Sequence, residues 1–166
     1  MCFMIQIKEY PANKDFFIRL KFFCREILDL CNQLRVTPIA YGSLAYFGYT
    51  KNKTIRVNDF DFLIPEIHFE KIIKVLAKNK IKYNYSAEWH TLQIFNDDLR
   101  IELDSIDYWY SGPRDFRDFD FDGLIVKAIS LEGLKLQYKK ASETSKDRPD
   151  EYRKKFSVLE KLKQVS

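Results

Sequence analysis

Apolar residues recur every three or four positions in three parts of the chain, which is the period of an amphipathic helix. The first stripe predicts a helix over residues 14–34, with Asn13 upstream as its cap. Its members are Phe16, Leu20, Phe23, Ile27, Cys31 and Leu34. A second stripe predicts a helix over residues 69–76. A third follows residues 144–147, which have the spacing of a capping box, and its members are Tyr152, Phe156, Leu159 and Leu162.

Other segments form short apolar runs or alternate polar and apolar residues, as β-strands do. Residues 38–41 and 58–64 are predicted strands, and the first is followed by a helical turn over residues 44–47. Two later runs, residues 83–95 and 99–108, are separated by Asn-Asp-Asp, a turn-prone cluster. The pair therefore predicts a β-hairpin.

The C-terminal part begins with a polar, aromatic and turn-rich stretch, residues 111–122, which we interpret as a long connection. Residues 124–129 predict a last strand, and Ser130 caps a helix that runs to about Lys140. Helices mixed with strands, some of them in a hairpin, indicate an α/β fold with a mixed sheet flanked by helices. The length, with no repeat or linker, predicts a single domain over residues 1–166.

Composition narrows the functional classes only modestly. A net charge of +4 with 31% charged residues does not indicate a dedicated nucleic-acid binder, although it permits an anionic substrate. Three cysteines without C-x-x-C spacing argue against a disulfide framework and a zinc site. Without a leader pattern or a long apolar window, we expect a cytoplasmic protein with no membrane partner. The 16% aromatic content leaves a homodimer open.

The candidate chemistry starts at Gly42-Ser43 and at Asp59-Phe60-Asp61. A glycine lets the backbone approach a phosphate, and the serine hydroxyl and following amides can donate hydrogen bonds to it. Residues two apart on a strand point to the same face, so Asp59 and Asp61 project together while Phe60 enters the core. Two such carboxylates repel each other unless a cation lies between them, and Mg²⁺ binds carboxylates together with phosphates.

A third carboxylate can stand on the strand predicted from residue 99. There the apolar side chains take one face, while Arg100, Glu102 and Asp104 take the other. Each motif alone has an ordinary interpretation, since Ser43 can be a helix N-cap and paired aspartates can line a solvated edge. Together, and in this order, they predict a phosphate cradle, two metal ligands and a further acidic residue at one site.

In these motifs the sequence resembles the nucleotidyltransferase superfamily, which includes DNA polymerase β, antibiotic nucleotidyltransferases and small stand-alone domains. Gly42-Ser43 matches the first family element and Asp59-Phe60-Asp61 the second. Asp104 is the best match to the third, with Glu102 as the alternative. The motifs cover residues 36–106, and the C-terminal part resembles the helices of small members more loosely.

The resemblance implies a nucleotidyltransferase-like fold with C-terminal helices and a metal-dependent reaction. Two Mg²⁺ ions bind a nucleoside triphosphate such as ATP, and an acceptor hydroxyl attacks the α-phosphorus and expels pyrophosphate. Asp59, Asp61 and Asp104 are then the catalytic and metal-binding residues, and Asp104 can accept the hydroxyl proton. Gly42 and Ser43 bind the triphosphate. Lys146 either reaches the triphosphate or is a solvated charge near a helix start.

Two departures from the family pattern bear on the acceptor. The bulky Leu44, Tyr46 and Phe47 follow the glycine-serine pair, and no nucleic-acid-binding domain is appended. Both disfavour nucleic acid and favour a hydroxyl of a small molecule or protein. Residues 108–122 either shape an acceptor pocket, for example for a cationic molecule, or form a rigid surface loop. The competing hypotheses are a non-catalytic nucleotide-binding or antitoxin-like protein of the same fold, and an α/β interaction module whose acidic strands are accidental.

Overall fold

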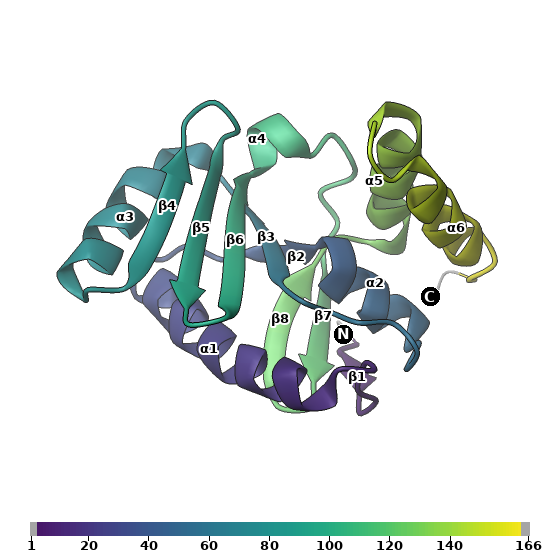
Figure 1. The fold of residues 1–166 in the computed structure, drawn as a ribbon, viewed down its shortest axis with the longest axis horizontal. Helices are drawn as coiled ribbons and strands as arrows, with labels where there is room; N and C mark the ends of the chain where they lie inside the picture. Colours follow the sequence, from purple (N-terminus) through teal and green to yellow (C-terminus); the bar gives the residue numbers. More distant parts are fainter. Residues whose placement is uncertain (1–2, 164–166) are drawn as a thin grey trace.

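The computed structural model describes residues 3–163 and consists of an eight-stranded mixed sheet with helices around it (Figure 1). The strand order is β1-β7-β8-β2-β3-β6-β5-β4. The strands are β1 (Ile5–Ile7), β2 (Ile39–Tyr41), β3 (Phe60–Ile64), β4 (Lys82–Ser86), β5 (Thr91–Asn96), β6 (Leu99–Ser105), β7 (Arg117–Phe121) and β8 (Leu124–Ala128). The predicted α/β fold with a mixed sheet is confirmed.

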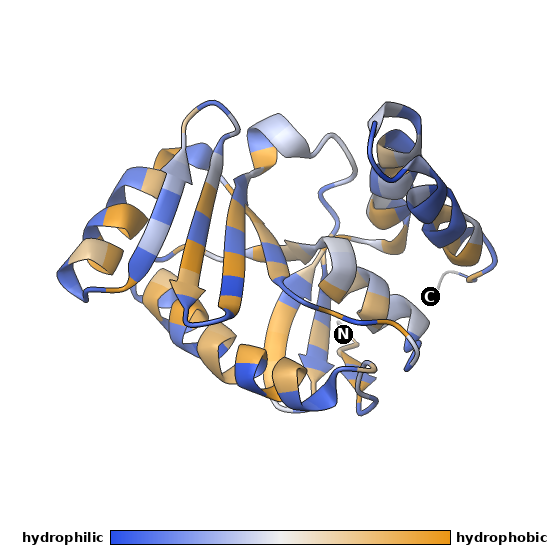
Figure 2. Cartoon of the chain, viewed as in Figure 1, coloured by the Kyte–Doolittle hydropathy of each residue, from blue (hydrophilic) through white to orange (hydrophobic). Residues whose placement is uncertain are grey.

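The helices follow the predicted apolar stripes closely in the first half of the chain. They are α1 (Lys14–Gln33), α2 (Gly42–Thr50), the 3₁₀ turn η1 (Glu66–His68), α3 (Phe69–Lys78), α4 (Ile106–Trp109), α5 (Leu131–Thr144) and α6 (Pro149–Glu160). Helices α5 and α6 pack on each other, and both contact α2 (Figure 1). The outward sides of α5 and α6 are largely hydrophilic, whereas hydrophilic and hydrophobic residues alternate along strands β5 and β6 (Figure 2).

Four sequence predictions were wrong. The run over residues 99–108 ends as a strand at Ser105, and α4 follows it directly. The run over residues 83–95 holds two strands, because a turn at residues 87–90 divides it into β4 and β5. The presumed connection 111–122 contains β7, in which Phe119 and Phe121 alternate with aspartates and are buried between β1 and β8. The last helix begins at Pro149 and not at the proposed capping box, because proline fits the first turn and Thr144 still belongs to α5.

The core lies between the sheet and α1. Phe17 of α1 packs edge-on against Phe60 of β3 at a ring distance of 5.3 Å and against Phe47 of α2 at 5.7 Å. Phe60 and Phe62 are fully buried, as the strand alternation predicts. The residue between them, Asp61, points to the opposite side of β3, so burial of the phenylalanines sets the direction of the carboxylate.

Candidate active site

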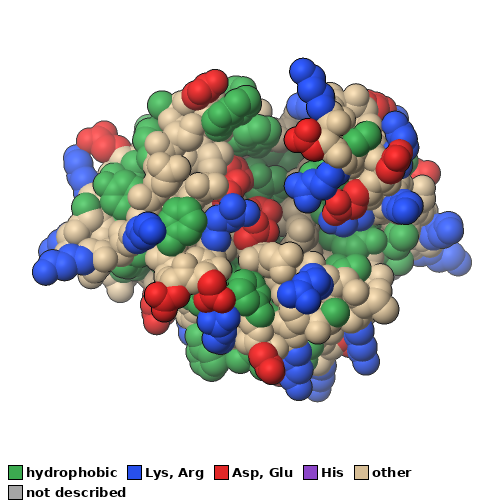
Figure 3. Space-filling model, in the orientation of Figure 1, with side chains coloured by type: hydrophobic (Ala, Val, Ile, Leu, Met, Phe, Trp, Pro, Cys, Tyr) green, Lys and Arg blue, Asp and Glu red, His purple; other side chains and the backbone are tan. Residues whose placement is uncertain are grey.

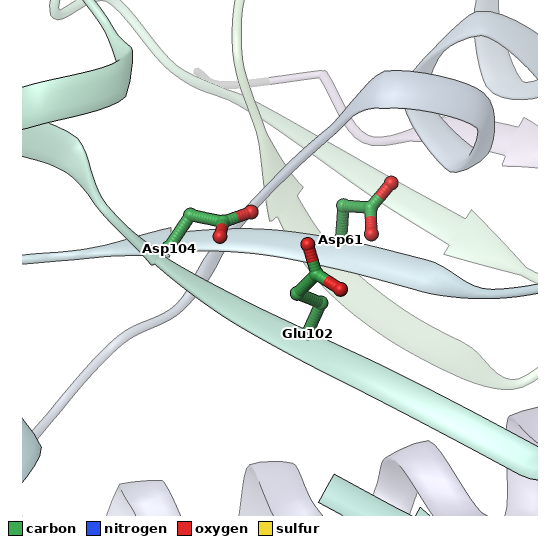
Figure 4. A group of neighbouring side chains, drawn as sticks. All are labelled: Asp61, Glu102 and Asp104. Atoms are coloured by element: carbon green, nitrogen blue, oxygen red, sulfur yellow. The ribbon is translucent and has the colours of Figure 1, made fainter. Parts of the chain in front are cut away.

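Strand register brings the acidic residues together. β3 and β6 are parallel neighbours, and Asp61 pairs directly with Glu102. Asp104 lies two residues further along β6, on the same face as Glu102. One carboxylate oxygen from each of Asp61, Glu102 and Asp104 lies within 4.8 Å of the others (Figure 4). Three carboxylates at this spacing form a donor set for a hard divalent cation.

The charges in this cluster are not balanced by the protein alone. Burial raises the pKa of Asp61 well above its usual value, and the neighbouring Asp59, Glu102 and Asp104 raise it further. Arg100 opposes this effect, and its guanidinium pairs with Asp59 and lies 4.0 Å from a carboxylate oxygen of Glu102. A cation among these carboxylates would therefore relieve their mutual repulsion.

Asp104 is the deepest of the acidic residues, with only 2% of its surface exposed. Its two oxygens accept hydrogen bonds from the hydroxyls of Tyr41 and Thr91. Burial raises the pKa of Asp104 to about 6, although both hydrogen bonds act in the opposite direction. Burial and the nearby carboxylates also raise the pKa of Tyr41, which keeps that hydroxyl a donor. The hydroxyls of Tyr41 and Thr91 thus enclose Asp104, whereas Asp61 and Glu102 line a solvent-accessible cavity.

The glycine-serine turn lies directly beside Asp61. Gly42 has a φ of +62°, and a β-carbon at this position would lie 2.9 Å from Oδ2 of Asp61. Its N–H donates to Oε1 of Gln137 at 3.3 Å. Gly42 also begins α2, whose first amides lack partners within the helix. The absent side chain therefore allows the start of a helix to approach the carboxylates.

We predict that Gly42→Ala lowers the unfolding free energy by about 1–2 kcal/mol, the cost of placing a β-carbon in left-handed backbone. The new methyl also displaces the Asp61 carboxylate, so Mg²⁺ binding should weaken. Urea denaturation and metal titration measure the two effects. Gly123→Ala is the matched control, because Gly123 has a φ of +94° but no neighbour nearer than 3.7 Å. Equal metal binding in both variants would contradict the proposed contact.

These residues line a cavity of about 520 Å³ between the sheet and α5–α6. Its acidic lining residues are Asp59, Asp61, Glu102 and Glu151, and its basic lining residues are Arg56, Arg100, Arg148 and Lys155. Glu151 lies beside the basic residues Arg148 and Lys155. Figure 3 shows Asp and Glu side chains at the floor of a hollow, with Lys and Arg side chains around it. The acidic residues on the floor can bind a metal ion, and the basic residues at the rim can bind phosphate oxygens, so the cavity suits a metal-bound polyphosphate.

Solved structures with the same arrangement of elements are nucleotidyltransferases. ANT(2'')-Ia in complex with adenylyl-2''-tobramycin has a TM-score of 0.61 at 13% identity, over 84% of this chain and 86% of that one. The chain has the nucleotidyltransferase fold. The lincomycin-bound lincosamide antibiotic adenylyltransferase LnuA has a TM-score of 0.57 at 15% identity, over 86% and 96%. A Thermotoga maritima protein assigned as a nucleotidyltransferase has a TM-score of 0.58 at 18% identity, over 91% and 98%.

The sequence matches no protein-family model and no curated protein, so the similarity to nucleotidyltransferases is one of fold. Among the helices of residues 3–163, none combines the length and apolarity needed to cross a membrane.

Within the nucleotidyltransferase fold, most of the predicted site residues meet at one cavity. Gly42, Ser43, Asp59 and Asp61 all line it. Two predicted residues do not line it: Asp104 is buried beside it, and Lys146 is exposed in the connection between α5 and α6. Two basic residues that the sequence analysis did not select, Arg148 and Lys155, line the cavity instead.

Lys155 is the better placed of these two basic residues. Its side chain is only 20% exposed, and its Nζ lies 3.3 Å from Glu151. The same Nζ lies 5.5 Å from the ring centre of Tyr46 and 5.4 Å from that of Tyr138. The sequence signal that could have found it is its position three residues after Tyr152, on the packed side of the last helix.

Proposed function

We propose that this protein is a Mg²⁺-dependent nucleotidyltransferase that moves a nucleoside monophosphate from a nucleoside triphosphate to a hydroxyl group. The observation that carries the proposal is the cluster of Asp61, Glu102 and Asp104 beside the Gly42 turn, in a cavity with a basic rim. The fold similarity to ANT(2'')-Ia and LnuA supports it, and because both neighbours are adenylyl-transferring enzymes, ATP is the first nucleotide to test.

The donor set fits Mg²⁺, since it consists of carboxylate oxygens, and two of its members, Asp61 and Glu102, line the cavity. We propose Asp59, Asp61 and Glu102 as the ligands. Glu102 is preferred to Asp104 because it lines the cavity opposite Asp61, while both oxygens of Asp104 already accept hydroxyl hydrogen bonds. Bound Mg²⁺ would neutralise the charge that develops on the phosphate oxygens and on the departing pyrophosphate.

The protein's own groups would then position the triphosphate and the acceptor. The amides at the start of α2 and the Ser43 hydroxyl can donate to phosphate oxygens, as helix N-termini commonly do. Arg148, which directly precedes α6, and Lys155 within α6 supply positive charge. A base must lie within hydrogen-bond reach of the attacking hydroxyl, and Glu102 is the group proposed for this role because it lines the cavity.

A thermal-shift measurement with the four ribonucleoside triphosphates, each with and without Mg²⁺, tests the site first. Saturating ligand at one hundred times its dissociation constant should add about 2.7 kcal/mol to stability. Pyrophosphate release in the presence of candidate hydroxyl acceptors tests the reaction. Stabilisation without pyrophosphate release from any acceptor would favour the non-catalytic nucleotide-binding protein, and no stabilisation would overturn the nucleotide site altogether.

Lys155→Met is expected to raise the KM for the nucleoside triphosphate about tenfold, which corresponds to about 1.4 kcal/mol of lost binding, with kcat little changed. Methionine keeps the length of the side chain and removes its charge. Steady-state pyrophosphate release measures both constants. Lys146→Met is the matched control and should behave as the unmodified protein, because Lys146 is exposed outside the cavity. A larger effect at Lys146 would reverse the assignment.

A further inference from the structure

A second hollow of about 410 Å³ adjoins the carboxylates on the side of β4 and β5. It shares Glu102 with the cavity already described, and its other lining residues include Asn84, Ser86, Trp89, Gln93 and Trp109. The chain contains two tryptophans, and both are here. Trp89 is 54% exposed and Trp109 40% exposed. Two large exposed rings beside a candidate active site indicate a binding surface.

Hydrogen bonds and ring contacts hold these tryptophans in place. Nε1 of Trp109 donates to the carbonyl oxygen of Trp89 at 2.8 Å, and the N–H of Trp89 donates to Oγ of Ser86 at 3.2 Å. Tyr108 packs edge-on against Trp109 at 5.1 Å and stacks on His90 at 4.2 Å. The Trp109 ring and the backbone of Trp89 are therefore positioned before any ligand arrives, which lowers the entropic cost of binding.

The polar groups of the hollow are amides and hydroxyls. Nδ2 of Asn84 lies 3.4 Å from Oε1 of Gln93, and Nε2 of Gln93 donates to Oε2 of Glu102 at 3.0 Å. Among its lining residues only Glu102 is ionisable, and Arg100 lies 4.0 Å from it. A polycation would find one carboxylate here, already engaged, and an anion would find no positive partner in the lining.

Flat aromatic rings beside neutral amides suit a ligand with an apolar face and hydroxyls around its edge. This is the chemistry of an uncharged sugar ring. Another cavity, of about 570 Å³, also adjoins the site, but it meets it through Tyr41, Gln137 and Ala141 and its lining contains no member of the carboxylate cluster. Of these two neighbouring hollows, only the one lined by Trp89 and Glu102 would place a bound hydroxyl beside a carboxylate of the cluster.

We propose that the second hollow binds the acceptor and that the acceptor is an uncharged sugar or glycoside; the assignment as acceptor rests on the proposed function. One hydroxyl of the ring gives its proton to Glu102, and its oxygen forms the new bond to the α-phosphorus. The bond from that phosphorus to the oxygen bridging to the β-phosphate breaks, and pyrophosphate leaves. Neither an oxidant nor a further reactant is needed.

Tryptophan fluorescence tests this directly, because both tryptophans report from the hollow. In Trp109→Phe the remaining tryptophan, Trp89, lines this hollow and not the other two cavities at the site. Titrating that variant with a panel of neutral methyl glycosides and disaccharides should give a saturable change in emission for at least one member. The same sugar should bind to Asp61→Asn unchanged, since Asp61 does not line this hollow.

Calorimetry on two further variants separates recognition from folding. Trp89→Ala should weaken binding of that sugar about tenfold or more, whereas Trp89→Phe, which keeps an aromatic ring, should retain most of it. Phe22→Ala is the matched control, because it removes another exposed aromatic ring, 62% exposed, from α1. An equal loss in the Phe22 and Trp89 variants would overturn the assignment.

The outcomes distinguish this inference from the proposed function. Sugar binding together with sugar-stimulated pyrophosphate release supports both. Sugar binding with no pyrophosphate release from any triphosphate overturns the nucleotidyltransferase proposal and with it the role as acceptor site. Tobramycin, which is polycationic, and the nucleoside triphosphates are titrated as comparison ligands. A Trp89 response only to these comparison ligands, or to no member of the sugar panel, overturns the inference. Metal-dependent pyrophosphate release with another acceptor would leave the enzyme proposal standing.

Discussion

Asp61→Asn should reduce metal-dependent pyrophosphate release by on the order of 10³-fold, the effect of removing a central charged group from a transition-state site. Asp61 pairs with Glu102 across the two strands and lies beside the Gly42 turn, so its position is fixed by β3 and no other residue of that strand can replace its carboxylate. Asparagine preserves the shape of the side chain. Initial rates with saturating Mg²⁺ and ATP measure the loss.

The same variant should be more stable without metal. Because the pKa of Asp61 is raised in the folded protein, its ionised form disfavours folding once the pH exceeds the usual aspartate value. Removing that charge at neutral pH should therefore raise the free energy of unfolding. Mg²⁺ should then raise the melting temperature of the unmodified protein and leave that of Asp61→Asn unchanged.

Asp29→Asn provides the control for Asp61→Asn, because Asp29 is an exposed carboxylate on α1, away from the cavity. It should keep both activity and the Mg²⁺ response. Full turnover by Asp61→Asn, or an equal loss in both variants, would contradict the site.

Glu102→Gln should lower kcat by on the order of 10²-fold, whereas Asp104→Asn should lower it less than about tenfold. Both residues point to the same side of β6, but Glu102 lines the cavity and Asp104 is shielded by Tyr41 and Thr91. Each substitution replaces one carboxylate with its amide, so the chemical change is the same at both positions. Steady-state kcat and Mg²⁺ affinity should be measured for both.

The opposite ranking has a definite meaning. A greater loss in Asp104→Asn would make Asp104 the third ligand, as its motif match implies. Equal losses accompanied by unchanged Mg²⁺ affinity would exclude both residues from metal binding and would leave Asp59 and Asp61 as the remaining candidates.

The local parts of the fold could be predicted because they depend on neighbouring residues. The stripe over residues 14–34 predicted α1 within one residue at its end, and the alternation around Phe60 and Phe62 predicted which side of β3 is buried. β7 was missed because aspartates alternate with its buried phenylalanines and a Gly-Pro pair precedes it. Its stability as a strand comes from pairing with β1 and β8, distant in sequence.

The candidate site divides in the same way. Gly42-Ser43 and the two aspartates could be identified from sequence, because their chemistry depends on spacing within a turn or a strand. The sequence could place Lys155 on the packed side of the last helix but not at this cavity, because it reaches the cavity only through the packing of α6 against α5 and α2. Lys146 is nearer the predicted helix start but projects from the connection before it.

The sequence by itself determined the helix stripes, the buried side of β3 and the acidic character of the site, since each follows from periodicity and residue type. Only the tertiary structure decided which carboxylates meet. The parallel register of β3 and β6 sets Asp61 opposite Glu102, and hydroxyls from β2 and β5 enclose Asp104. Register arises from the packing of whole strands against a shared core, so no local pattern specifies it.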